Sequence, residues 1–152
     1  NHRGISVGSF YRRPDNPFIH DAYDAALQAI ADPIFSRDRA GMGRMLRHVR
    51  GGGTLAIAVD QHVQDGARLS FFGRPARTAL TAAELARRHD APLVPVHGRR
   101  NPDGLTFTVE AMAPIPHGEP EATMQAVNDD LERGVRGRMG QWLWFHRRWK
   151  GA

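Results

Sequence analysis

Two polar groups of residues follow segments that are predicted to be strands, and these residues are well placed to do chemistry. The segment 11–17, Tyr-Arg-Arg-Pro-Asp-Asn-Pro, follows the first strand, and Asp60-Gln61-His62 follows a later apolar run. In open α/β sheets, ligands bind beyond the carboxyl ends of the strands. An arginine there can bind phosphate or carboxylate through two N–H groups, and an aspartate can orient an arginine or a sugar hydroxyl. The competing interpretations are a solvated basic turn and a loop-capping aspartate.

A third group combines adjacent aromatic residues with a glycine. Phe71, Phe72 and Gly73 are followed by Arg74 and Pro75. Two neighbouring rings beside a glycine can form the wall of an apolar slot that accepts an acyl chain. Taken by itself, the pattern equally fits one ring in the core and a second ring that covers it.

The fourth group lies in the C-terminal tail, where aromatic and basic residues alternate. Its members are Trp142, Trp144, Phe145, Arg147, Arg148, Trp149 and Lys150. Tryptophan with arginine suits a membrane interface, where the rings lie at the headgroups and the cations meet phosphates. The same residues suit stacking on nucleic-acid bases or packing of a C-terminal helix on the core.

The histidines give no sign of a metal or nucleophile site. None of the eight is followed by Asp or Glu five positions later, and the chain has no cysteine. The sequence motifs of zinc proteases, serine hydrolases, phosphate-binding loops and dinucleotide-binding folds are missing as well. We therefore expect no metal and no cofactor.

Apolar periodicity and turn residues predict alternating strands and helices. Helices are predicted at 18–30, 36–50 (with Ser36 as the N-cap), 78–89 and 121–138, and strands at 5–11, 54–59, 91–97 and 105–112. The continuous apolar run at 54–59 predicts a strand buried on both faces, and 61–75 is interpreted as a loop. The order predicts an α/β fold, a layered sheet flanked by helices, in one domain over residues 1–152.

Charge and chain ends restrict the partners. The net charge is +5 and the pI is near 10.9, which favours an anionic partner such as a phosphorylated lipid, nucleic acid, an anionic membrane or an acidic protein. No run of about 18 apolar residues is present, so no membrane span is expected. Because the chain begins with Asn1, we expect a fragment, with any membrane anchor upstream.

The order of these motifs resembles the lipid A biosynthesis acyltransferases. The resemblance rests on Tyr-Arg-x-Pro-x-Asn-Pro, Asp-Gln, Phe-Phe-Gly-x-Pro-Ala, Ala-Pro-Leu-Val-Pro-Val and the terminal Trp-x-His-Arg-Arg-Trp-Lys. It implies a glycerolipid acyltransferase-like fold and transfer of a fatty acyl group from acyl carrier protein to a hydroxyl of a lipid A precursor. It also implies a place at the cytoplasmic face of the bacterial inner membrane, and no cofactor.

The resemblance also implies what is missing. The family signature is H-x-x-x-x-D/E, in which the histidine acts as general base and the acid orients it. In the family this motif precedes the Tyr-Arg strand, and position 7, five after His2, is Val. We therefore expect no catalytic residue in this fragment, an N-terminally truncated domain, and no activity from the fragment alone.

Residue roles follow from matching positions to the family. Arg12 is expected to bind phosphate or carboxylate of the acceptor, and Asp60 matches an acidic position of the family. The other expected substrate-binding residues are Asn16, Arg37, Gln61, Phe71, Phe72, Gly73 and Arg99. The tail residues Trp142, Trp144, Arg147, Arg148, Trp149 and Lys150 are expected at the membrane interface.

Two alternatives stay open. The first is an acyltransferase for another glycolipid, such as a mannoside. The second is a nucleic-acid-binding module, suggested by the pI and the tail. Basic residues are spread over several segments instead of one stripe, and no nucleic-acid motif is present. We therefore expect no nucleic acid among the partners.

Overall fold

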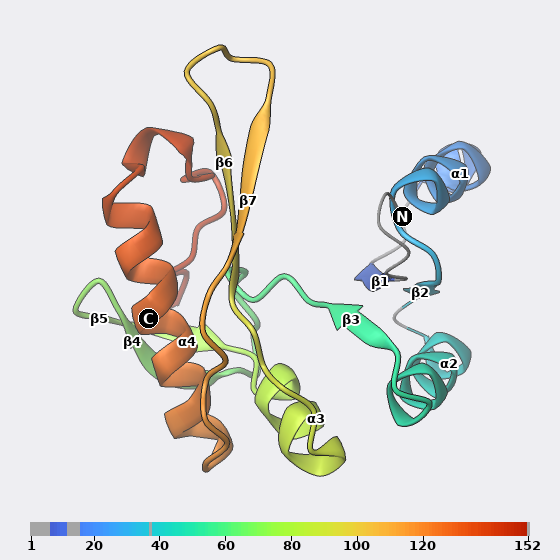
Figure 1. Cartoon of the computed structure of the whole chain (residues 1–152), viewed down its shortest axis with the longest axis horizontal. Coiled ribbons are helices and arrows are strands. Elements are labelled where there is room, and N and C mark those ends of the chain that lie inside the picture. Colours follow the sequence, from blue (N-terminus) through green and yellow to red (C-terminus); the bar gives the residue numbers. More distant parts are fainter. Residues whose placement is uncertain (1–6, 12–15, 37, 152) are drawn as a thin grey trace. The chain divides into compact units, whose positions relative to one another are not determined.

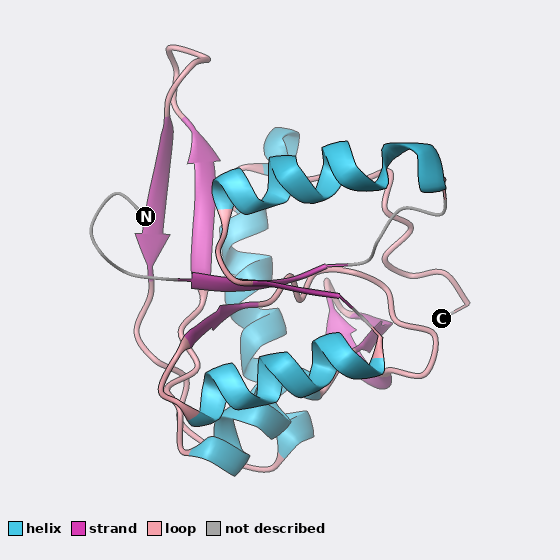
Figure 2. Ribbon diagram, turned by 90° about the vertical axis from the view of Figure 1, so that its right-hand side faces the viewer, coloured by secondary structure: helices cyan, strands magenta, loops and turns pink. Residues whose placement is uncertain are grey.

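The computed structural model describes residues 7–11, 16–36 and 38–151. The chain forms two compact units, and the first ends at Ile57 where the second begins at Ala58 (Figure 1). Each unit combines helices with a few short strands (Figure 2). The predicted α/β class, with small sheets flanked by helices, is confirmed.

The first unit is built on three short parallel strands. β1 (Val7–Tyr11) lies between β2 (Ile34–Ser36) and β3 (Thr54–Ala56). Ser9 pairs with Ile34 on one side, and Val7 pairs with Thr54 on the other. The predicted strand before Arg12 is confirmed, whereas β2 was not predicted.

Helices connect these strands. The 3-10 turn η1 (Pro17–Ile19) leads into α1 (His20–Ile30), and α2 (Arg39–Arg50) follows β2. The prediction that Ser36 caps the second helix is wrong, because Ser36 is the last residue of β2. The cap is Asp38, whose carboxylate accepts a hydrogen bond from the Gly41 N–H at 2.7 Å.

The core of the first unit is small. Phe35 and Met45 are buried, and the Phe35 ring lies 5.4 Å from the ring of His48. The prediction that strand 54–59 is buried on both faces is wrong, since Thr54 and Ala56 are exposed. Among the described residues β3 pairs with β1 on one side only, so it is the last strand of this small sheet.

The second unit begins with a hairpin where we predicted a loop. β4 (Ala67–Phe71) pairs with β5 (Arg74–Thr78) in antiparallel register. The two turn residues, Phe72 and Gly73, have φ of 54° and 70°, which is the left-handed geometry of a tight hairpin turn. The prediction of a loop over 61–75 is therefore wrong for the hairpin residues.

A second hairpin follows helix α3 (Thr81–His89). It consists of β6 (Val96–Arg100) and β7 (Phe107–Ala111). The predicted turn at 101–104 is confirmed: Gly104 N–H donates to the Asn101 carbonyl at 3.0 Å. Because β6 starts at Val96, the strand predicted at 91–97 lies several residues too early.

Helix α4 (Pro120–Arg136) organises the second unit. It packs on β4 and on α3, and it buries Met124, Val127 and Val135. Phe71 and Ala76 complete this core from the first hairpin. After α4 the chain forms the 3-10 turn η2 (Met139–Gln141) and continues as turns to residue 151.

Candidate functional site

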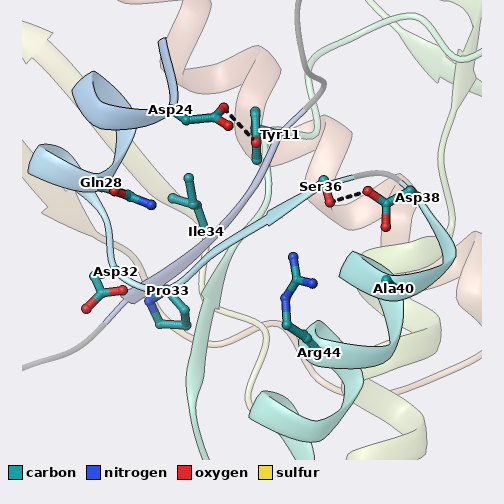
Figure 3. Close-up of a pocket in the computed structure, with 10 residues that line it drawn as sticks. All are labelled: Tyr11, Asp24, Gln28, Asp32, Pro33, Ile34, Ser36, Asp38, Ala40 and Arg44. Atoms are coloured by element: carbon teal, nitrogen blue, oxygen red, sulfur yellow. Dashed lines mark hydrogen bonds between the residues drawn. The ribbon is translucent and has the colours of Figure 1, made fainter. Parts of the chain in front are cut away.

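A pocket of about 650 Å³ lies in the first unit, where β1 and β2 end (Figure 3). Tyr11 and Ser36 are the last residues of these strands. Helices α1 and α2, the connection between α1 and β2, and the start of β2 supply the remaining walls. The lining residues are Tyr11, Asp24, Gln28, Asp32, Pro33, Ile34, Ser36, Asp38, Ala40 and Arg44. The volume is in the usual range for small-molecule sites.

Hydrogen bonds hold the pocket walls in place. The Tyr11 hydroxyl donates to Asp24 Oδ1 at 2.8 Å, which ties α1 to the end of β1 (Figure 3). The Ser36 hydroxyl donates to Asp38. This bond and the Gly41 N–H hold the pKa of Asp38 below its usual range. Asp38 is therefore ionised at neutral pH.

The predicted residues of the first unit meet this pocket only in part. Asn16 is exposed and caps η1, where its side chain accepts from the Phe18 N–H at 3.0 Å. Arg12 and Arg37 lie outside the described residues. In the sequence, Arg12 follows Tyr11, and Arg37 stands between two lining residues.

Sequence reasoning missed the helical side of the pocket. Asp24 and Gln28 are one turn apart on α1, so they share a face. Arg44 comes from α2. The four-residue spacing of Asp24 and Gln28 indicates a shared helix face. Only the fold shows that this face borders the ends of two strands.

Five aromatic rings form one cluster in the second unit. The centre of the Phe71 ring lies 5.5 Å from that of Trp142 and 5.6 Å from that of Trp149. Phe72 is 4.9 Å from Phe71, and Trp144 is 4.7 Å from Trp142. Phe71 is fully buried, so its ring supports the cluster from inside. The tail therefore packs on the first hairpin without forming a helix.

Arginines surround these rings. The guanidinium of Arg136 lies 4.6 Å from the centre of the Phe72 ring, and that of Arg74 lies 5.6 Å from Trp149. Glu132 pairs with Arg136 at 2.6 Å and accepts a hydrogen bond from the Phe72 N–H. These contacts stabilise Phe72 in a conformation that is strained for a non-glycine residue.

Arg148 is the largest buried side chain of the second unit, with 1% of its surface exposed. Its guanidinium donates to the Arg77 carbonyl and, at 2.7 Å, to Thr78 Oγ1. Burial lowers the pKa of Arg148, and the negative charge of Asp60 opposes that shift. Arg148 is therefore not part of the exposed surface.

The remaining predicted residues are spread over the second unit. Asp60 is half-buried, Gln61 is exposed, and Gly73 occupies the hairpin turn. Arg99 pairs with Glu110 at 3.5 Å, and Glu110 also binds Arg138 at 3.2 Å. In the tail, Trp144, Arg147 and Lys150 are exposed, whereas Trp142 and Trp149 are half-buried.

One histidine–carboxylate pair was not foreseen. His97 Nε2 lies 2.6 Å from Asp130 Oδ2, and both side chains are largely buried. Arg133 binds the other oxygen of Asp130 at 2.9 Å.

No cluster of three or more possible metal ligands occurs in the part of the chain that the structure describes. No helix among the described residues has the length and apolar character needed to cross a membrane.

Fold and site together define a mixed α/β protein with a polar pocket at parallel strand ends and an arginine-rich aromatic cluster. Residues 3–151 match the family model described as bacterial lipid A biosynthesis acyltransferase. The chain belongs to this family, which is a family of enzymes.

Two curated relatives support this assignment. A lipid A biosynthesis acyltransferase of Haemophilus influenzae is 27% identical over 99% of this chain and 49% of its own length. The lipid A biosynthesis lauroyltransferase of Escherichia coli is 30% identical over 97% of this chain and 48% of its own length. The chain thus spans about half the length of these relatives.

Proposed function

We propose that the protein containing this chain transfers a fatty acyl group from an acyl carrier protein thioester to a hydroxyl of a lipid A precursor. The observation that carries the proposal is the family match, which runs through nearly all 152 residues. In the reaction the acceptor oxygen loses a proton and attacks the thioester carbonyl. The C–O ester bond forms, the C–S bond breaks, and the thiol leaves with the proton.

In this proposal the chain binds and orients substrates. None of its eight histidines is followed by an acid five positions later, so the general base comes from another part of the protein. We expect the 152 residues alone to transfer no acyl group.

The pocket of the first unit binds the polar head of the acceptor. Its lining offers carboxylates and an amide that accept hydrogen bonds from sugar hydroxyls, and Arg44 adds a donor. Arg12 and Arg37 keep their expected role in binding phosphate or carboxylate. Asn16 keeps its expected role in substrate binding.

The aromatic cluster serves the acyl chain. Because Phe71 is fully buried, the half-exposed ring of Phe72 is the surface that an acyl chain meets. Gly73 allows the turn that presents this ring. Arg99, Asp60 and Gln61 keep their expected roles in substrate binding.

The protein acts at the cytoplasmic face of the inner membrane, and the tail contributes a contact. Residues 133–152 contain six Lys or Arg and no acid. The side chains of Leu143 and Phe145 are 63% and 92% exposed. Exposed apolar side chains among cations suit an anionic bilayer, and an acidic carrier protein fits the same charge.

The test is an acyl-transfer assay with the full-length gene product. Acyl carrier proteins loaded with chains of different length serve as donors, and a lipid A precursor or a mannoside lipid serves as acceptor. We expect transfer to the lipid A precursor. No transfer to it at any chain length contradicts the proposal, and transfer to the mannoside alone replaces the acceptor.

Two variants test the pocket in the same assay. Arg12→Ala and Arg44→Ala each remove a charged donor, so we expect the acceptor KM to rise about tenfold, the equivalent of 1.4 kcal/mol. Arg88→Ala, on the exposed side of α3, is the control and should leave the kinetics unchanged. Wild-type kinetics in the two pocket variants would remove their assigned roles.

A further inference from the structure

The tail contacts the segment that carries Asp60 and Gln61. The His62 N–H donates to Nε2 of His146 at 2.8 Å, across 84 positions of sequence. Nε2 accepts this bond with its ring lone pair. The bond fixes the backbone two residues after Asp60.

Arg148 anchors the same part of the tail in the core. Besides its two hydrogen bonds to β5, its guanidinium lies 5.5 Å from the centre of the Phe71 ring. Thr78, which accepts one of those bonds, also accepts a bond from Asn128 of α4 at 3.2 Å. Tail, hairpin and helix are thus joined through buried polar groups.

A buried cation is costly unless a negative charge compensates it. No carboxylate of the described residues lies within 4.0 Å of Arg148. Asp60 is the acid whose charge acts on the guanidinium, from beyond that distance. The guanidinium is therefore held in place mainly by its hydrogen bonds to the Arg77 carbonyl and to Thr78 Oγ1.

We propose that His146 and Arg148 are positioning residues for acceptor binding. His146 fixes the backbone at His62, and Arg148 anchors the tail segment that carries His146 through its bonds to Arg77 and Thr78. Together they hold Asp60 ready to accept hydrogen bonds from acceptor hydroxyls. The inference rests on the proposed function and assigns a task to the terminal His-Arg-Arg-Trp-Lys motif.

The test compares paired substitutions in the full-length gene product. His146→Gln keeps an acceptor oxygen close to the position of Nε2, whereas His146→Leu removes it. We expect His146→Leu to raise the acceptor KM about tenfold, since 1.4 kcal/mol corresponds to a factor of ten. His146→Gln should stay within about twofold, a difference below one hydrogen bond. The acyl-donor KM should not change in either variant.

A double variant separates positioning from general stability. If His146 acts through Asp60, combining His146→Leu with Asp60→Ala raises the acceptor KM no further than Asp60→Ala alone. A purely structural role predicts multiplied effects, with losses in kcat and in donor use. Arg148→Lys keeps the charge but lacks the two separate donor nitrogens that reach the Arg77 carbonyl and Thr78 Oγ1, and its acceptor KM should also rise. If that variant does not fold, the His146 pair decides.

Two outcomes overturn the inference: equal kinetics for the Leu and Gln variants, or multiplicative effects with Asp60→Ala. Arg88→Ala is the matched control, and it should behave as wild type in every assay. If the wild-type enzyme transfers no acyl group to any acceptor, the proposed function fails. If the wild type is active and the His146 pair is indistinguishable, only the inference fails.

Discussion

At the scale of the residue, Asp38 links the end of β2 to the start of α2. Its ionised carboxylate accepts hydrogen bonds from the Ser36 hydroxyl and the Gly41 N–H. These two bonds hold its pKa below the ordinary value of 3.8. Gly41 is required there because a Cβ would collide with the backbone of Ser36.

The depressed pKa of Asp38 predicts a pH-dependent stability. A carboxyl whose pKa falls on folding stabilises the fold above its unfolded pKa, and this contribution is lost as the pH falls through the folded pKa. We expect Asp38→Ala to lower the free energy of unfolding at pH 7. The gap to wild type should close as the pH falls below 3.8.

Urea denaturation of the full-length protein at several pH values measures this gap. Asp65→Ala is the control, because Asp65 is exposed and lies in the turn before β4. A gap for Asp38→Ala that persists unchanged at low pH would contradict the expected linkage.

At the scale of the element, segments with strong local sequence signals were predictable, and short strands were not. The helix at 121–138 and the turn at 101–104 were placed correctly, because each rests on strong local signals. β2 has three residues, too few to show a period. The first hairpin was missed because Phe72 occupies a turn position that usually holds Asn, Asp or Gly.

The Phe72–Gly73 turn gives a sharp test of backbone geometry. Gly73 has φ +70° and open space around its missing Cβ, so only the backbone conformation disfavours a side chain. We expect Gly73→Ala to lower the free energy of unfolding by about 1 kcal/mol. Gly98→Ala, in β6, also meets open space but has no positive φ, and it should cost much less. Equal losses in urea titrations would argue against strain in the turn.

At the scale of the whole molecule, the family and the α/β class could be predicted from the sequence. The residues that line the pocket could be identified only from the fold. Asp24, Gln28 and Arg44 form the pocket only because α1 and α2 border the same strand ends. The burial of Arg148 could not be predicted either, because it stands in a run of aromatic and basic residues and its neighbour Arg147 is exposed. That residues 1–152 form one domain stays a prediction.

The basic tail predicts charge-dependent membrane binding by the whole protein. We expect replacement of both Leu143 and Phe145 by Ser to weaken binding of the full-length protein to vesicles rich in phosphatidylglycerol. The loss should be about tenfold, since two apolar side chains leave the bilayer interface. Replacing Leu105 and Val109 by Ser is the matched control, because both are exposed apolar residues of the second hairpin.

Sedimentation with vesicles at low and high salt measures this binding. Added salt should weaken binding of the wild type, because screening reduces the attraction of cations to lipid phosphates. Equal losses in the two double variants would contradict a specific role of the tail. Unchanged vesicle binding together with weaker binding of acyl carrier protein would assign the tail to that partner.

The packing of the tail on the first hairpin also constrains how the protein is made. The Trp149 indole donates to the Phe71 carbonyl, across 78 positions of sequence. During synthesis the hairpin therefore emerges from the ribosome long before the residues that enclose it. Until Trp142 and Trp149 have emerged, the Phe71 ring lacks two of the aromatic rings that pack on it. We therefore expect a chain that ends ahead of Trp149 to hold its first hairpin less firmly, because it lacks the ring and the hydrogen bond that Trp149 supplies.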